Sequence, residues 1–442
     1  MKRAAIACLL LVATLGFTAC GGSNNKSSGK STTITAWVGW SASTHELAAF
    51  KRLVAEYDKK HDDVKVKVVG DINDDKIIAA IRSGNVPDVV STFTSSNAGS
   101  FCKTGAWIDL DPLLKQDKVD MGNFTKTPMY YTQYQGTRCA LPLLADTFGL
   151  YYNKAMFAKA GIKRPPHTIS ELTADAKKLT QRNPDGSLKV VGFDPFYGFY
   201  DGAPNKVLRF ASLFGGKYID NQGHSILSKD PAWENELKWQ KSLVDWYGYD
   251  KLVRFQAGLG DEFSASNAFE KGKLAMAEDG EWRVAFIALE HPELKYGTAP
   301  MPAADNRQDL YGSGHVNGTI IGIPRGVKHK DQAWKLLKYL TTDDHFLAQF
   351  SNAIRNVPTT KTSLSSSEID PDPHFAPFLK IINNPHSSTA PITPVGAAYQ
   401  TLIQNFAIKY QAGHVGDLHA GLVNLDKQID AQLEQAQAGG AP

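Results

Sequence analysis

The chain has 442 residues, a nearly balanced charge and a composition typical of a globular protein. Its 48 basic residues face 45 acidic ones, so the formal net charge is +3, and no basic run with interleaved aromatic residues occurs. Nucleic acid is therefore not expected as a partner, because such binding needs a concentrated positive patch. The length exceeds what one hydrophobic core usually covers, which predicts two domains.

Residues 1–19 have the pattern of a secretory signal peptide. Lys2 and Arg3 precede an apolar run, and a Thr-Ala pair precedes Cys20, which together match a charged start, an apolar stretch and a small-residue cleavage site. The Thr-Ala-Cys sequence resembles a bacterial lipobox and predicts lipidation of Cys20. Ordinary cleavage beside an incidental cysteine is the alternative. Residues 20–32 would then form a lipid-anchored, flexible tether on the extracellular face of the bacterial cell membrane.

Strands and helices alternate along the first part of the mature chain. Period-two alternation and β-branched runs predict strands at 33–40, 64–69 and 87–90. Helices are expected to begin at two capping boxes, Ser43-x-x-Glu46 and Thr168-x-x-Glu171. Such alternation predicts α/β layers with mostly parallel strand pairing.

Cys102 and Cys139 are the cysteines that remain if the signal is removed and Cys20 is lipidated. Their surroundings have no metal-ligand spacing, and an oxidising exterior favours a disulfide between them. Two separately buried thiols are the alternative. No cofactor or metal site is expected, because histidine, cysteine and aspartate do not cluster with ligand spacing.

Five segments occur in an order that resembles a known family. They are GNVPDVV, LPLLADTFGLYYNKAMFAKAGIKRPPHTISEL, LFGGKYIDNQG, FEKGKLAMAEDGEW and GTIIGIPRGVKHKDQAWKLLKYL. Together they resemble the family 1 extracellular solute-binding proteins, which are maltose-binding-protein-like receptors of bacterial ABC importers. The resemblance implies the two-lobe periplasmic-binding-protein type II fold, of the α/β class, with a hinge and an interlobe ligand cleft. Lobe one would comprise 33–144 plus 318–357, and lobe two 146–317 plus 358–442.

A turn in the fourth of these segments provides the main binding candidate. Trp282 follows a β-rich run and precedes the helical run RVAFIALE, so the Gly-Glu-Trp sequence is a strand-to-helix turn. In the resembled family the tryptophan of this turn stacks on sugar, and a flat aromatic ring suits the apolar face of a sugar. Packing in the core of lobe two is the alternative. Asp279 and Glu281 would accept hydroxyl protons in strong hydrogen bonds, or would simply favour the helix start.

Further ligand-binding candidates lie at strand ends and at the expected crossovers between the lobes. They are Trp40, Ser41, Ser95, Asn97, Asp146, Tyr200, Asp201, His315 and Arg355. Asp146 occupies the position of a sugar-binding carboxylate in the resembled family, and a solvated hinge acid is the alternative. Asn97 is equally suited to cap a helix, and Arg355 to lie on the surface. Trp37 is assigned to the core, because it shares a face with alternating apolar residues.

These observations predict a carbohydrate receptor that delivers its ligand to the transmembrane permease of an ABC importer by hinge closure. We expect a monomer whose partners are the sugar, the permease and, through the lipid anchor, the membrane. The same fold binding a polyamine, a phosphodiester or a peptide is one alternative. A glycoside-active enzyme is the other. It would need carboxylates on both sides of the scissile bond, whereas Asp279 and Glu281 share one turn, so no catalytic activity is expected.

Overall fold

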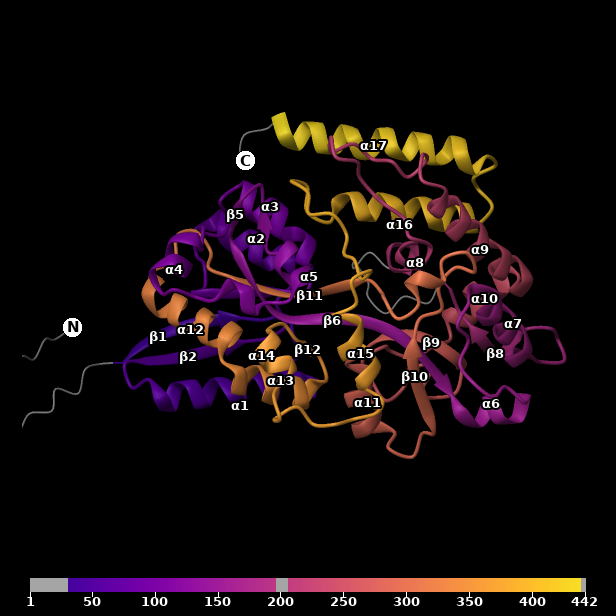
Figure 1. The fold of residues 1–442 in the computed structure, drawn as a ribbon, viewed down its shortest axis with the longest axis horizontal. Coiled ribbons are helices and arrows are strands. Elements are labelled where there is room, and N and C mark those ends of the chain that lie inside the picture. Colours follow the sequence, from indigo (N-terminus) through magenta and orange to yellow (C-terminus); the bar gives the residue numbers. More distant parts are fainter. Residues whose placement is uncertain (1–30, 196–205, 439–442) are drawn as a thin grey trace, which may run out of the picture.

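The computed structural model describes residues 31–195 and 206–438 of the chain. The predicted signal peptide, Cys20, Tyr200 and Asp201 lie outside these residues. The described part forms one large mixed sheet with helices packed around it (Figure 1). A short hairpin of β4 (Gln133–Tyr134) and β5 (Thr137–Arg138) stands apart from that sheet.

The main sheet runs through both halves of the molecule. Its strand order is β2-β1-β3-β11-β6-β9-β8-β7, and β10 and β12 also pair with β6. We call β2, β1, β3 and β11 the first half of the sheet, and β9, β8 and β7 the second half. The strands are β1 (Thr32–Trp37), β2 (Val64–Val69), β3 (Val89–Thr92), β6 (Ala140–Asn153), β7 (Gln181–Arg182), β8 (Leu188–Phe193), β9 (Leu274–Gly280), β10 (Tyr296–Pro300), β11 (Val316–Gly322) and β12 (Val357–Pro358).

Strand β6 joins the two halves of the sheet (Figure 1). Its first residues pair with β11 as far as Thr147, and its later residues pair with β9 from Phe148 onward. Nearly all of its side chains are buried, as expected for a strand that is covered on both faces. Asp146 interrupts this apolar run beside the point where β6 changes partners, so a carboxylate is placed at the junction of the two halves.

The prediction of mostly parallel strand pairing is wrong for the described strands. Strand β1 is parallel to β2 and β3, and β8 is parallel to β9. Strand β6 is antiparallel to β9, β10, β11 and β12, and β11 is antiparallel to β3. Strands that cross between the halves must run in opposite directions to go and return. The local alternation of strands and helices carries no information about this return.

The first half of the sheet is covered by eight helices within the described residues. They are α1 (His45–Lys60), α2 (Asp74–Ser83), α3 (Ala98–Lys103), α4 (Asp111–Gln116), α5 (Lys126–Tyr130), α12 (Lys330–Thr342), α13 (Asp344–Ile354) and α14 (Lys361–Leu364). Helix α1 buries Leu47, Phe50, Leu53 and Val54 in a core shared with β1, α12 and α13, because their spacing in the sequence places them on one face of the helix. Trp37 is partly buried against the neighbouring core, in agreement with its assignment.

Helix α1 does not begin at the predicted capping box. Its N-cap is Thr44, and no side chain makes a cap hydrogen bond there. The Ser43 hydroxyl instead pairs with the Ser41 hydroxyl at 2.9 Å, within a turn that precedes the helix. The Glu46 carboxylate therefore does not serve as a capping-box partner of Ser43, and it borders a cavity described below.

The second half is covered by a longer series of helices. They are α6 (Lys154–Ala160), α7 (Ile169–Leu179), α8 (Lys206–Phe214), α9 (Pro231–Tyr247), α10 (Tyr249–Gln256), α11 (Arg283–Glu290), α15 (Ala376–Ile381), α16 (Ala398–Gln411) and α17 (Leu418–Ala438). Thr168 caps α7 by accepting a hydrogen bond from the Glu171 backbone N–H at 3.1 Å, as predicted. Helix α16 packs on α8, α9 and α17, and its neighbour α17 forms the outer layer (Figure 1).

A disulfide joins Cys102 in α3 to Cys139, the residue directly before β6. The predicted pairing is confirmed in the structure, and the alternative of two separate thiols is not. The bond ties a helix of the first half to the start of the crossing strand. Among the described residues, none of the helices combines the length and apolar character that a membrane span requires.

Candidate ligand-binding site

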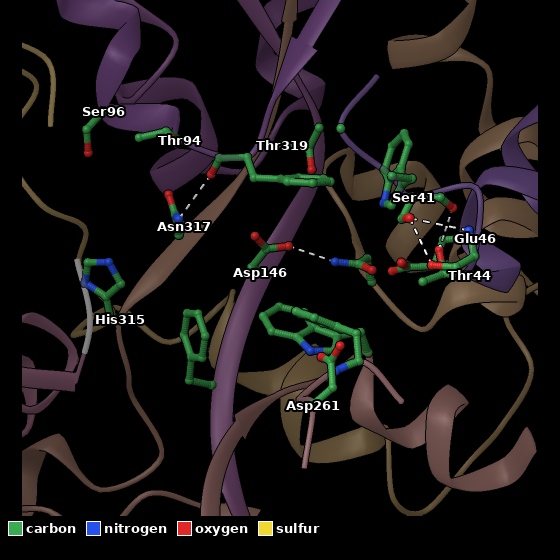
Figure 2. Close-up of a pocket in the computed structure, with 18 of the residues that line it drawn as sticks. Ser41, Thr44, Glu46, Thr94, Ser96, Asp146, Asp261, His315, Asn317 and Thr319 are labelled. Atoms are coloured by element: carbon green, nitrogen blue, oxygen red, sulfur yellow. Dashed lines mark hydrogen bonds between the residues drawn. The ribbon is translucent and has the colours of Figure 1, made fainter. Parts of the chain in front are cut away.

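A cavity of about 460 Å³ lies where the two halves of the molecule meet. Trp40 and Glu46 border it from the first half, and Phe148 and Trp282 border it from the second. Asp146, on β6, also borders the cavity (Figure 2). The volume falls within the range of roughly 300–1,000 Å³ that is common for small-molecule sites. Among the described residues, no cluster of His, Cys, Asp or Glu has an arrangement that could hold a metal ion.

Trp282 forms one wall of the cavity. It stands directly before α11, at the end of the turn that follows β9, so the predicted strand-to-helix turn is present. Its side chain is only 7% exposed, and its ring meets the Phe148 ring edge-on at 5.7 Å between centroids. A Cβ on Gly280 would lie 2.2 Å from the indole ring, so glycine is required beneath it. The turn thus holds a rigid aromatic surface against the cavity.

Trp40 contributes aromatic surface from the opposite half. Its ring packs against Phe50 at 5.2 Å, Phe350 at 5.0 Å and Phe93 at 5.7 Å between centroids. The side chain is 4% exposed and still borders the cavity, so Trp40 is both a core residue and a lining residue. Ser41, the next residue, also lines the cavity.

Asp146 shares one amide group with a second buried carboxylate. The Asn356 Nδ2 group donates to Asp146 Oδ1 at 2.7 Å and to Glu281 Oε1 at 3.1 Å. Glu281 Oε2 accepts the backbone N–H of Thr147 at 2.8 Å. Burial raises the pKa of Asp146 to about 7, and burial together with the nearby Asp146 charge raises the pKa of Glu281 well above its usual value. Asp146 lines the cavity, whereas Glu281 is not among the lining residues.

Glu46 adds a second carboxylate to the cavity wall. It lies in the first turn of α1 and is buried. Burial raises its pKa to about 7, and a hydrogen bond with Thr44 partly offsets that effect. Figure 2 shows Glu46 beside Ser41 and Thr44 at one end of the cavity, opposite His315. The wall therefore offers a strong acceptor for ligand hydroxyl groups when Glu46 is ionised.

His315 lies at the other end of the cavity, just before β11. Burial, reinforced by the nearby Arg209 guanidinium, lowers its pKa to about 3, so the imidazole is neutral. A neutral ring has one nitrogen that donates and one that accepts, and Nδ1 has no hydrogen-bond partner among the described residues. His315 is therefore able to bond a ligand hydroxyl group.

An interaction between distant parts of the chain closes the wall near Ser96. Gln400, in α16, donates from Nε2 to the Ser96 hydroxyl at 2.7 Å, and both residues line the cavity. Nearby, Asn97 Oδ1 accepts the backbone N–H of Ala397 at 3.1 Å. The segment that begins α16 thus reaches from the helical layer of the second half to the first half.

Five of the predicted binding residues border the cavity, namely Trp40, Ser41, Asp146, Trp282 and His315. Five others are not among its lining residues: Ser95, Asn97, Asp279, Glu281 and Arg355. Asp279 accepts from Arg283 Nε at 2.8 Å within a buried ion pair, and Arg355 ends α13 with a left-handed backbone and packs over Phe375. Asn97 donates to Asp74 at 2.8 Å, and Ser95 donates to Asn317.

Several lining residues were missed by sequence reasoning. They include Glu46, Thr94, Asp261, Phe263, Asn317, Thr319, Asn356 and Gln400. Some lie one residue from a predicted candidate: Asn356 follows Arg355, and Thr94 and Ser96 flank Ser95. Asn317 and Asn356 lie beside the predicted crossovers between the lobes, and this position could have marked them as candidates. Nothing in the local sequence points to Asp261 or Gln400, because they reach the cavity from segments that are remote in the chain.

The comparison with protein families identifies the class. A model described as bacterial extracellular solute-binding protein matches residues 52–377. The chain therefore belongs to this family. Among curated relatives, a putative binding protein of Brucella abortus is 30% identical over 322 residues, covering 71% of this chain and 72% of that protein. The maltotriose-binding protein of Pyrococcus abyssi is 23% identical over 360 residues, covering 80% and 73% of the two chains.

A solved structure extends the likeness to the whole fold. The protein CpMnBP1 with mannobiose bound superposes with a TM-score of 0.80 at 27% sequence identity. The match covers 90% of this chain and 100% of that one. The predicted two-lobe solute-binding fold is thereby confirmed, together with the recognition of the family.

Proposed function

We propose that the protein captures a sugar or oligosaccharide in the cavity and delivers it to the permease of an ABC importer. The observation that carries the proposal is the lining of the cavity: two tryptophans, Trp40 and Trp282, together with hydroxyl, amide and carboxylate groups from both halves. Aromatic rings suit the C–H faces of a sugar, and the polar groups suit its hydroxyl rim. The bound mannobiose in a structure that is 27% identical supports the same ligand class.

Hinge closure accounts for capture and release. Lobe one, 33–144 plus 318–357, and lobe two, 146–317 plus 358–442, would rotate about β6, β11 and the segment before β12. A sugar that contacts both lobes stabilises the closed state by its differential affinity for that state. The closed complex would then dock on the permease. The protein acts as a monomer and performs no chemistry on the sugar.

A titration panel tests this function. Mannobiose, mannotriose and maltotriose are added to the mature protein, and melting temperature and heat of binding are measured. A ligand at about 100 times its Kd adds about 2.7 kcal/mol of stability, which gives a clear upward shift in the melting temperature. Chromatography of the recovered sugar should show no shorter products. Failure of every sugar to bind, or release of products in excess of protein, would contradict the proposal.

A polyamine is the second candidate ligand, because three carboxylates border the cavity: Glu46, Asp146 and Asp261. Spermidine belongs in the same panel for this reason. Saturable binding of spermidine with no response to sugars would assign the protein to polyamine capture. We favour a sugar because a polyamine makes no use of the hydroxyl and amide donors along the wall.

We propose that a lipid on Cys20 anchors the protein to the membrane, in line with the Thr-Ala-Cys sequence at the end of the predicted signal. Cys20→Ala should release the protein from the membrane fraction or leave its precursor uncleaved. Cell fractionation and intact-mass measurement check this, with Cys8→Ala, inside the predicted signal peptide, as a control that also loses one cysteine. A Cys20→Ala protein that is still mature and membrane-bound would exclude the lipid anchor.

A further inference from the structure

The cavity is rich in hydrogen-bond acceptors and carboxylates. Glu46, Asp146 and Asp261 border it, and Asn356 Oδ1 has no hydrogen-bond partner among the described residues. Asn356 is 6% exposed, so this oxygen lacks ready access to bulk water. A buried acceptor without a donor is costly. A ligand that brings hydrogens, such as a sugar hydroxyl, satisfies the oxygen, whereas a ligand oxygen without hydrogen does not.

The described lining contains no lysine and no arginine. Two buried arginines are close to it in the second half, but both are paired with carboxylates. Arg209 forms a bidentate pair with Glu278 at 2.8 and 2.9 Å, and its guanidinium carbon lies 4.5 Å from the centroid of the Phe148 ring. Arg283 contacts three carboxylates, those of Asp279, Glu262 and Glu270. Each guanidinium group is thus matched by at least one carboxylate, and neither arginine is a lining residue of the cavity.

We propose that the cavity selects its sugar by charge, accepting uncharged sugars and excluding those with a carboxylate or phosphate group. The inference rests on the proposed function and adds the ligand's charge class to it. An anionic ligand would lose its hydration on entry, find no cation among the described lining residues and face like charges on Glu46 and Asp146. Repulsion of the wrong ligand is a recognised route to specificity. Neutral sugars meet the same carboxylates as hydrogen-bond acceptors.

Two disaccharides that differ in charge test this selection. β-1,4-Mannobiose and β-1,4-dimannuronate share ring configuration and linkage, and dimannuronate carries a carboxylate on each ring. Calorimetric titration at about pH 8 keeps Glu46 and Asp146 ionised, because the pKa of each is about 7. Salt at about 0.15 M limits the effect of charges outside the cavity. Mannobiose should bind at least about a hundredfold more tightly, which corresponds to roughly 2.7 kcal/mol. Dimannuronate binding within about threefold of mannobiose would overturn the inference.

Variants that remove one cavity charge provide the second arm. Glu46→Gln and Asp146→Asn are close in shape to the native residues. Each should reduce the ratio between the dimannuronate Kd and the mannobiose Kd by at least about tenfold, or roughly 1.4 kcal/mol. Asp63→Asn removes one carboxylate from the exposed loop between α1 and β2, outside the cavity lining, and should leave the ratio of the two Kd values unchanged. Melting curves confirm that each variant is folded.

The outcomes distinguish failure of the charge inference from failure of the proposed sugar-binding function. If the ratio of the two Kd values is unchanged in both cavity variants, the carboxylates of the cavity wall do not determine the preference for uncharged sugars. If dimannuronate binds and mannobiose does not, a solute-binding function remains and the charge inference is wrong. If none of the sugars in either panel binds, the proposed sugar function fails, and the inference fails with it.

Discussion

Trp282→Ala is the perturbation that probes the site most sharply. The indole is 7% exposed, meets Phe148 edge-on and fills the space above Gly280, so its removal leaves a large gap in the wall. Truncation of an aromatic residue at the centre of a ligand site costs at least about 2 kcal/mol when that residue is a hot spot. The affinity for sugar should therefore fall by roughly thirtyfold or more.

The same substitution should also lower stability in the absence of sugar. Tryptophan to alanine in a core costs about 3–5 kcal/mol. We expect the lower part of this range for Trp282, because its side chain borders the cavity as well as the core. Within the described part of the chain its cluster is also small, with Phe148, Trp282 and Phe286 buried and Phe263 beside them.

Calorimetric titration and ligand-free melting on two variants separate these effects. Trp282→Phe keeps an aromatic face and much of the packing, so it should retain most of the affinity that Trp282→Ala loses. The readout is the Kd for mannobiose beside the melting temperature without sugar. Native affinity in Trp282→Ala, accompanied by a strongly lowered melting temperature, would assign the ring to the core alone and refute its role in sugar binding.

Three further substitutions follow from particular contacts. Gly280→Ala places a Cβ 2.2 Å from the Trp282 ring and must displace it, so calorimetry should show weaker sugar binding; native affinity would mean that the ring position does not matter. Glu236→Gln should make the protein more stable at neutral pH. Burial raises the pKa of Glu236 well above its value of 4.5, and neither carboxylate oxygen has a hydrogen-bond partner among the described residues. The contribution of Glu236 to the stability of the native protein is thus greatest below the unfolded pKa and is lost as pH rises through the folded pKa. Urea titration of the variant should therefore give a flatter dependence of stability on pH; equal pH dependence would contradict this. The double variant Cys102→Ser, Cys139→Ser opens a loop of sequence separation 37 and should lose about 4 kcal/mol, and an unchanged urea midpoint would show that the bond adds no stability.

Local periodicity predicted individual elements well. The strand over 64–69 has the predicted bounds, and α11 covers the predicted run from Arg283 to Glu290. Both depend on nearest neighbours in sequence, since an alternating or helical apolar pattern is visible in one short segment. The Thr168 cap is local in the same way. The Ser43 box failed because Ser43 pairs with Ser41 two residues earlier, and such a competing hydrogen bond is not visible in the box pattern.

The direction in which the strands pair could not be predicted from short segments of the sequence. Strand β6 receives partners from β9, β10, β11 and β12, which lie far along the chain. Their antiparallel register follows from the need to cross between the halves and return. Only the resemblance to a two-lobe family suggested the crossing, and it gave no register.

The candidate site was predictable where a turn presents a residue and less so where packing selects among neighbours. Trp282 and Asp146 line the cavity because a turn and a strand junction place them there. In the run that contains Ser95, Ser96 and Asn97, a short 3-10 helix directs Ser96 to the cavity, while Ser95 and Asn97 bond to Asn317 and Asp74. Sequence identifies such a loop as polar but does not determine which hydroxyl faces the ligand.

A crystal structure of the mature protein grown with mannotriose is the most direct test of sugar capture in the cavity. We expect one sugar chain enclosed in the cavity, with a ring against Trp282, a hydroxyl within hydrogen-bond distance of Asp146 and contacts to residues such as Trp40 in the opposite half. Mannotriose bound only on the outer surface, with the cavity filled by water in crystals grown at a sugar concentration well above the solution Kd, would contradict sugar capture in this cavity.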